Sequence, residues 1–326
     1  MSLWSRLCRP ATAAVLTATA IVLMASPPVA TGFGTIEGLG QHSEHEKITR
    51  LALKDAGLGR KTLDELAGKR GRLGAVGAPD IRLALDPAAH CDGGDYLDVP
   101  GYPQSKADAR LRLKRCRAFI DVHFLAAVRD AEQLVDASGS INESEIPTLI
   151  GCSYNGSKGR AKCNVLEELG LVFHAAQDFY SHTNWVDEAA AGAAGAGNPP
   201  GLGNDQPSPW LDPRLSEPFP DGLISGCFDG IPESAHCNDG GTGAKRVKHQ
   251  ALNKDNGKID VRSGKIGAGS SERGGINGNF ARAVRAAIAD TTDKWRLFEQ
   301  QILGGYGNKR GNKILCVLRS DNPSSC

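Results

Sequence analysis

The sequence predicts a mainly α-helical protein with a single domain and long loops clipped by disulfide bonds. Three long segments carry apolar residues at the spacing of one helix face, and strand-like alternation is scarce. The chain has 326 residues, of which 40% are hydrophobic and 23% charged, so its composition is that of an ordinary globular protein with enough length for a core. Forty glycines and seventeen prolines indicate long irregular loops.

The amino-terminal residues 1–30 have the pattern of a secretory signal peptide. Two arginines precede the apolar run Ala11–Met24, which is shorter than the roughly 20 residues that span a bilayer. We expect cleavage between residues 25 and 31, with Ala30 as the preferred end, and a domain that covers residues 31–326. Because no other run is long and apolar enough, we expect a secreted, extracellular protein without an integral membrane segment.

Helices are expected in the following order, each from apolar residues at helical spacing. Residues 44–58 place Ile48, Leu51 and Ala52 on one face, and Thr62 suits the start of a short helix. Residues 71–101 are rich in Gly, Asp and Pro and are expected to be irregular. The expected helices are Glu44–Leu58, Thr62–Ala67, Lys106–Ala137, Glu145–Ile150, Asn164–Val186 and Phe280–Leu303.

Two long segments, residues 189–224 and 225–279, lack periodicity and are expected to be loops. Loops of this length are usually functional or disordered. Only Ile314–Leu318 is a fair candidate for a strand.

The cysteine content fits an exported chain. Cys8 would leave with the signal segment, and an even number of cysteines remains, which in an exported protein implies disulfide bonds. Sequence does not settle their pairing; bonds between neighbours in the chain are the simplest guess, and zinc bound to cysteine is the competing interpretation. The guessed pairs are Cys91 with Cys116, Cys152 with Cys163, Cys227 with Cys237, and Cys316 with Cys326.

The charge balance argues against a stable nucleic-acid partner. Lys and Arg number 38 and Asp and Glu 37, which gives a formal net charge of +1. Loss of residues 1–30 removes two arginines and no acid, which leaves 36 − 37 = −1. A positive field that holds long nucleic acids by their phosphates is therefore missing. We expect a monomer.

The main chemical motif is His174, Asp178 and His182, spaced by four residues. Each step of four turns a helix by about 40° and rises about 6 Å, so the three side chains share one face while the two histidines lie about 12 Å apart. Metal–ligand bonds are only about 2 Å long, so the histidines cannot readily share one ion. The spacing therefore favours at least two ions, although a hydrogen-bonded His–Asp pair without metal is the simpler alternative.

The segment His174-Ala-Ala-Gln-Asp-Phe-Tyr-Ser-His-Thr-Asn-Trp185 resembles the signature of the zinc-dependent phospholipase C and single-strand nuclease superfamily. It is most similar to the Het-C branch, and with its flanking features it also resembles the CinY-type secreted proteins of actinobacteria. The resemblance extends over most of residues 40–300, and the loops after Trp185 depart from it. It implies a mostly helical phospholipase C/nuclease-like fold around zinc, with two or three ions.

The resemblance also implies where further ligands come from. An amino-terminal histidine is expected, for which His45 is the better match and His42 the alternate. The remaining expected ligands are Asp80, His90, His249 and Asp255. The family's His-x-x-x-Glu spacing is not kept, because position 253 is Asn, and no Trp opens the mature chain.

Each of these residues also has a simpler structural interpretation. His45 could face solvent in a first helical turn, Asp80 could belong to a turn beside Pro79, and His90 could pack on a disulfide. His249 could be exposed in a glycine-rich loop. His123 is expected in the core and His236 to be structural or exposed.

In the implied reaction, Asp80 is both a ligand and the candidate catalytic base for water that attacks a phosphodiester. Tyr180 and Trp185 are candidate substrate-binding residues, whereas Phe179 is expected in the core. The near-zero charge favours a phospholipid or a small phosphoester as substrate over single-stranded nucleic acid. A non-catalytic, metal-stabilised recognition protein of the Het-C type is the other alternative. Serine-hydrolase and P-loop motifs are missing from the sequence.

Overall fold

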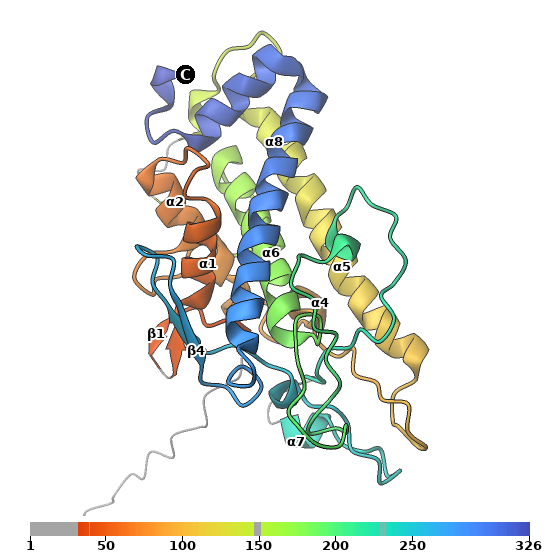
Figure 1. Cartoon of the computed structure of the whole chain (residues 1–326). Helices are drawn as coiled ribbons and strands as arrows, with labels where there is room; N and C mark the ends of the chain where they lie inside the picture. The colour runs from red at the N-terminus through yellow and green to blue at the C-terminus, as the bar shows by residue number, and fades with distance from the viewer. Residues whose placement is uncertain (1–31, 39, 147–150, 229, 231–232) are drawn as a thin grey trace, which may run out of the picture.

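The computed structural model describes residues 32–38, 40–146, 151–228, 230 and 233–326 and confirms a mainly helical single domain. The expected signal segment, residues 1–30, lies outside the described residues. Helix α6 (Ala161–His182) is the central element, and every one of its residues is buried. Helices α5 (Lys106–Ala131) and α8 (Asn279–Arg319) pack against it, as Figure 1 shows. A helix that is buried on all sides is usually apolar all round, but α6 also buries polar residues, among them Glu167, His174 and Asp178.

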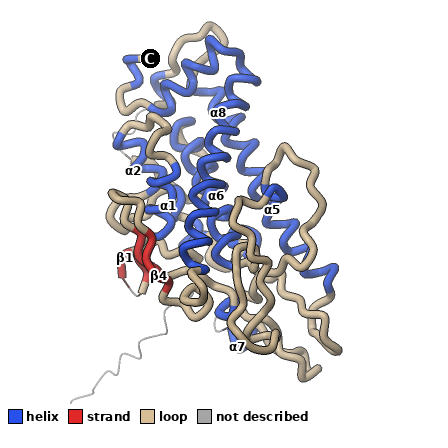
Figure 2. The backbone as a smooth tube through the Cα atoms, viewed as in Figure 1, coloured by secondary structure: helices blue, strands red, loops and turns tan. Residues whose placement is uncertain are grey.

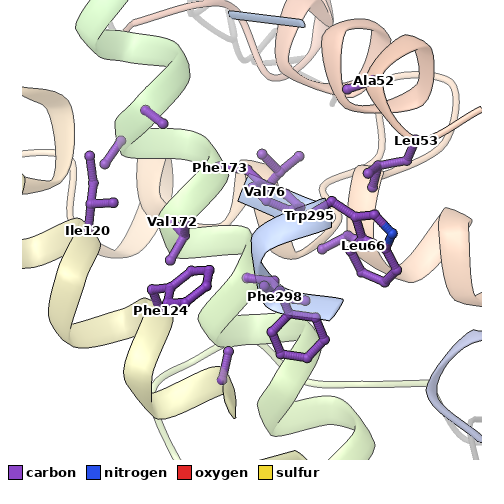
Figure 3. Packing of buried hydrophobic residues seen from close by; sticks show 14 of the residues in the cluster. Ala52, Leu53, Leu66, Val76, Ile120, Phe124, Val172, Phe173, Trp295 and Phe298 are labelled. Carbon is purple, nitrogen blue, oxygen red and sulfur yellow. The ribbon is translucent and has the colours of Figure 1, made fainter. Parts of the chain in front are cut away.

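The hydrophobic core lies where α6 meets its neighbours. Val172 and Phe173 of α6 are fully buried, and Phe298 of α8 and Phe124 of α5 belong to the same cluster. Figure 3 shows these side chains together with Leu66 of α2. Each fully buried side chain of this size contributes about 1.5–3 kcal/mol of hydrophobic stabilisation. The core therefore holds α6 firmly, and with it the polar residues on its carboxyl half.

The smaller elements surround this bundle. Helices α1 (Glu44–Ala52) and α2 (Arg60–Ala67) lie on one side of α6, and the short antiparallel pairs β1–β2 and β3–β4 lie below α1 in Figure 1. The remaining elements are β1 (Glu37–Gly38), β2 (Gln41–His42), β3 (Gly257–Ile259), β4 (Ile266–Gly269), α3 (Pro79–Arg82), α4 (Pro87–His90), α7 (Glu233–His236), and the 3₁₀ turns Ala75–Gly77, Glu132–Leu134, Glu143–Glu145, Pro209–Leu211, His249–Ala251 and Pro323–Ser325.

The long loops gather at the carboxyl end of α6, as the tan segments of Figure 2 show. The amide of Gly226 donates to the carbonyl of His182, and the amide of Lys254 donates to the carbonyl of Ser181. The second aperiodic segment of the sequence, residues 225–279, thus meets the last turn of α6. It carries His249 of the candidate metal centre.

Four disulfide bonds join cysteines that are neighbours in chain order, which are the pairs guessed from the sequence. The bond from Cys91 to Cys116 fixes the end of α4 against α5, and the bond from Cys316 to Cys326 closes the carboxyl terminus. The other two join Cys152 to Cys163 and Cys227 to Cys237. None of the helices in the described ranges has the length and apolar content to cross a membrane.

Several expected helix ends are wrong. The expected helix Glu44–Leu58 stops at Ala52, because Leu53 leaves the helical conformation (φ −103°, ψ 11°) and residues 53–57 form turns. The expected Asn164–Val186 runs from Ala161 to His182, where Thr183 becomes extended. The expected Lys106–Ala137 becomes a 3₁₀ turn after Ala131, and the expected Thr62–Ala67 begins at Arg60. In place of Glu145–Ile150 there is a 3₁₀ turn at Glu143–Glu145, and residues 147–150 lie outside the described residues.

The expected strand Ile314–Leu318 is also wrong, because these residues belong to the last part of α8. That helix continues past Leu303 and kinks at Gly307, where φ is 72°. Ile314, Leu315 and Leu318 are buried on one side, which is helical spacing. A five-residue apolar run suits a buried helix as well as a strand, so its length alone could not decide.

Candidate metal centre

Three groups of buried side chains hold nitrogen and oxygen atoms close enough to bind metal ions. We name them site A (His45, His174, Asp178), site B (Asp80, His90, His174) and site C (Asp92, His182, His249). Within each group, one ligand atom per residue lies within 4.8 Å of the others. His174 belongs to both site A and site B, so these two sites adjoin.

Helix α6 supplies the central ligands to all three sites. His174 and Asp178 lie one helical turn apart on the face toward α1 and α4, whereas His182 lies at the helix end near the 226–256 loops. His174 and His182 fall in different groups, consistent with the distance between them along the helix.

A 3₁₀ turn is pressed against α6 and holds His174. A Cβ atom on Gly170 would lie 2.5 Å from the backbone carbon of Ala75, so only glycine permits this approach. The neighbouring carbonyl of Val76 accepts a hydrogen bond of 2.8 Å from His174 Nδ1. Because a carbonyl only accepts, Nδ1 carries the proton and Nε2 presents its lone pair to sites A and B.

Site A joins α1 to α6. His45 Nε2 lies 3.2 Å from Asp178 Oδ1, and the His45 ring stacks on His174 with centroids 4.2 Å apart. His45 Nδ1 donates to Gln177 Oε1 at 2.8 Å, and the Gln177 amide group donates in turn to two threonine hydroxyls. The orientation of Gln177 is therefore fixed, and His45 presents the Nε2 lone pair. The amide of Phe33 also donates to Asp178 Oδ1 at 3.1 Å.

Site B joins the α3–α4 region to α6. His90 Nδ1 lies 2.8 Å from Asp178 Oδ2 and 3.1 Å from His174 Nε2. Asp80 Oδ1 is 3.7 Å from His174 Nε2 and 4.0 Å from His90 Nδ1. The two oxygens of Asp178 thus serve different sites, since Oδ1 faces His45 and Oδ2 faces His90 and His174.

Site C lies at the carboxyl end of α6. His182 Nδ1 donates to the carbonyl of His90 at 2.8 Å, and Asp92 Oδ1 is 3.1 Å from the same nitrogen. The rings of His182 and His249 are 4.4 Å apart in an edge-to-face arrangement. Backbone contact with Gly226 positions His249, since a Cβ on Gly226 would lie 2.3 Å from the Cα of His249.

The electrostatic field of the centre is set by Asp178. Burial alone would raise the pKa of Asp178, but the surrounding histidines hold it well below its usual range. Burial would likewise lower the pKa of His90, but the hydrogen bond and charge of Asp178 raise it to about 9. Burial raises the pKa of Asp80, and histidine neighbours only partly offset this. These groups therefore stabilise a positive charge between them. A proton carries that charge in the metal-free chain, and a metal ion would carry it when bound.

The pKa values of the other four histidines of the sites shift in different directions, according to the carboxylates near each of them. Burial lowers the pKa of His174 and of His249, which favours the neutral form that binds metal. Burial opposes protonation of His45 and His182 too, but carboxylates near each raise their pKa values.

Unpartnered atoms indicate that the centre fits metal. In the part of the chain that the structure describes, both oxygens of Asp80 are buried without a hydrogen-bond partner. His45 Nε2, Asp92 Oδ1 and His182 Nε2 are also buried, and each lies 3.1–3.4 Å from a His or Asp neighbour without the geometry of a hydrogen bond. Buried polar atoms without partners are rare and costly. Here they converge on the three sites, and a mixture of imidazole and carboxylate is a donor set that suits zinc.

All the ligands expected from sequence except Asp255 fall in the three sites. Asp255 lies beside site C, with Oδ1 3.4 Å from His182 Nε2, and accepts the hydroxyl proton of Ser181. Asn253, which stands where the resemblance predicted a glutamate, lies near His249. Asp92 was missed, although it stands two residues after His90. His42, the alternate for His45, is partly buried on β2 and joins none of the sites.

The two aromatic residues considered for substrate binding have different settings. Tyr180 is fully buried, and its hydroxyl accepts the amide proton of Ser208, so Tyr180 packs in the core. Trp185 is only partly buried, and its indole N–H donates to the carbonyl of Gln206. Phe179 is buried, as expected for a core residue.

Comparison of this chain with protein-family models, with curated proteins and with solved structures found no match.

Proposed function

We propose that this chain is an exported, zinc-dependent phosphodiester hydrolase of the phospholipase C type. The observation that carries the proposal is that Asp178 faces site A with one oxygen and site B with the other, while His174 belongs to both. A bridging carboxylate between two adjoining sites is suited to a pair of closely spaced cations. Pairs of metal ions roughly 4 Å apart are a usual apparatus for the hydrolysis of phosphate esters.

The residues divide into two adjoining ligand sets and a separate third. His45, His174 and Asp178 would hold one ion, and Asp80 and His90 would complete a second set with His174. Asp92, His182 and His249 would hold a third, with Asp255 beside it. When bound, zinc lowers the pKa of a coordinated water toward about 7 and offsets charge that develops on phosphate oxygens.

Asp80 is the proposed base that takes the proton of the attacking water. Its two oxygens have no hydrogen-bond partner among the described residues, so one can serve as a ligand while the other accepts a proton. Burial already raises the pKa of this carboxyl group, which makes it a better proton acceptor than an exposed aspartate. At 7% exposure, Asp80 is also the most exposed residue of sites A and B.

The proposed substrate is a phospholipid or a small phosphoester. The net charge of +1 gives no field for long nucleic acids. Trp185 stays partly exposed just beyond the end of α6 and is the remaining candidate for contact with an apolar or stacking group. The four disulfides are consistent with a protein that works outside the cytoplasm.

The experiment compares zinc-loaded and EDTA-treated protein on two substrates. Phosphatidylcholine vesicles are assayed for phosphorylcholine, and single-stranded DNA is assayed for free nucleotides. We expect EDTA-sensitive release of phosphorylcholine, restored by zinc, and loss of at least about 100-fold in Asp80→Asn, as removal of a general base typically causes. Release of nucleotides alone would favour the nuclease alternative instead.

The non-catalytic alternative has its own supporting observation. The side chains of all three sites are at least nine-tenths buried, which also suits ions that stabilise the fold without meeting a substrate. In that case zinc would raise the melting temperature, and neither substrate would be cleaved by the zinc-loaded protein.

A further inference from the structure

A cavity of about 810 Å³ is separate from the three metal sites, because no residue of these sites lines it. Its walls come from the end of α1, from one face of α8 and from the β3–β4 hairpin, with Arg319 at one side. Cavities of about 300–1,000 Å³ are the usual size for small-molecule sites. Neither the sequence motifs nor the proposed hydrolysis accounts for this space.

One part of the cavity wall is apolar. Leu51 of α1, Ile266 of β4 and Ile288 of α8 line it and are only partly buried, so each keeps apolar surface open to solvent. Trp295 lines the same space and is 3% exposed. An apolar ligand group of moderate size would cover this surface and gain about 25 cal/mol for each Å² removed from water.

The cavity also has donors without acceptors. The indole N–H of Trp295 and the Nε–H of Arg319 are both buried, and neither has a hydrogen-bond partner in the described part of the chain. A buried donor without an acceptor costs free energy that a ligand oxygen would recover. Two such donors in residues that line one cavity indicate an oxygen-bearing ligand.

The charges at the cavity are mostly positive. Lys54, Arg285, Arg296 and Arg319 line it, against Asp55 and Glu299. Arg319 is paired with Glu299. Arg285 is exposed and forms no ion pair within the described ranges. A guanidinium group without a partner suits a carboxylate or phosphate, which it binds through paired N–H donors.

We propose that this cavity binds an amphipathic anion, with its acidic headgroup toward the cationic side chains and unpartnered donors of the wall, Arg285 among them, and an apolar body against Leu51, Ile266 and Ile288. Lys54, Arg296 and Arg319 are each paired with an acid, so Arg285 selects the sign of the headgroup. The apolar wall favours a ligand that also has an apolar body. The proposal does not rest on the metal sites or on the proposed hydrolysis.

The test is a calorimetric titration of the intact zinc-loaded chain with sodium decanoate below its micelle concentration. We expect saturable binding at one site per chain. Acetate, which has the headgroup alone, and decyltrimethylammonium, which has the apolar body with the opposite charge, should give no saturable heat.

Two variants locate the binding. Arg285→Ser removes an exposed side chain and should weaken decanoate binding about 10-fold, while Ala289→Trp should fill the space and abolish binding. Arg262→Ser, an exposed arginine in the β3–β4 turn that does not line the cavity, is the matched control. The melting temperature of each variant verifies its fold. Absence of decanoate binding, equal binding of the cationic amphiphile, or unchanged binding in folded Arg285→Ser would overturn the proposal.

Discussion

The imidazole rings of His45 and His174 stack with their centroids 4.2 Å apart, although one belongs to α1 and the other to α6. Asp178, one turn after His174, points an oxygen at each site that these histidines serve. This arrangement brings an amino-terminal helix into the same polar centre as the buried core helix.

Asp178→Asn should remove the ions of sites A and B together, because the carboxylate belongs to site A and its second oxygen faces site B. We expect only the ion of site C to remain after dialysis against zinc at micromolar concentration. Inductively coupled plasma mass spectrometry of the purified variant gives the count. Glu167→Gln, a substitution of another acid on α6, is the control and should keep the wild-type zinc content. Retention of full zinc by Asp178→Asn would show that the carboxylate is not a ligand.

Asp92→Asn should have the complementary effect on site C. The amide lacks the negative charge that offsets a cation beside His182 and His249, so one zinc per chain should be lost while sites A and B stay loaded. Asp98→Asn, a change in the same irregular segment that touches none of the sites, is the matched control. If Asp92→Asn keeps its third ion, then Asp255 rather than Asp92 completes site C.

Gln177→Met should weaken zinc binding without removing a ligand. Gln177 accepts the Nδ1 proton of His45 and thereby turns the Nε2 lone pair toward site A. Loss of such an orienting group typically costs 10–100-fold in metal affinity. Competition with a fluorescent chelator measures the affinity. Gln177→Glu, which keeps the acceptor oxygen, should lose less affinity than Gln177→Met, and equal losses in the two variants would contradict the orienting role.

Removal of either of two disulfides should lower the unfolding free energy, but only one of the two removals should also weaken zinc binding. The Cys91–Cys116 bond anchors the segment that bears His90 and Asp92, whereas Cys316–Cys326 lies at the carboxyl terminus. Each paired Cys→Ala variant should lose about 2–4 kcal/mol of unfolding free energy. Only the Cys91/Cys116 variant should also bind zinc more weakly. Equal zinc affinity in the two folded variants would refute this link.

Lys162 should make the stability of the fold rise with pH above about 8. Its amine is buried against the carbonyls of Val317 and Ser320, and burial lowers its pKa to about 8, with Asp321 only partly offsetting this. The unfolded chain, with an ordinary lysine pKa of about 10.4, then binds more protons than the folded chain between about pH 8 and 10. Stability therefore increases with pH across that window.

The measurement is urea unfolding of the wild type and of Lys162→Met at pH 7.5 and pH 10. Titration of all other groups is shared by the two proteins and cancels. From pH 7.5 to pH 10, the unfolding free energy of the wild type should rise by about 2 kcal/mol relative to that of the variant. A constant difference between the two proteins would mean that Lys162 has no lowered pKa.

The helical architecture was predictable because its signals are local. The stripe of apolar residues before His174 predicts a long helix. The four-residue spacing of His174, Asp178 and His182 places these three side chains on one face of it. The end of the helix was not predictable, since Thr183 is extended for reasons that lie in its contacts with the 225–254 loops. Helix length followed from periodicity, and helix termination depended on tertiary contacts.

The assignment of Asp92 could not be made from spacing alone. Cys91, between His90 and Asp92, takes a left-handed conformation with φ of 55°. That turn lets His90 serve site B while Asp92 serves site C. Left-handed backbone is uncommon for a residue other than glycine, and here a disulfide holds the residue in place. A prediction from spacing along a regular backbone therefore identifies His90 as a ligand but omits Asp92.

The central claim is that three buried groups bind divalent cations, and native mass spectrometry of the folded protein prepared with zinc tests it most directly. We expect three zinc ions per chain, one for each group, which EDTA removes and whose number falls in the Asp178 and Asp92 variants. A protein that is folded, disulfide-bonded and free of zinc under the same conditions would contradict the claim. The three groups would then be hydrogen-bonded clusters of protonated histidine and aspartate.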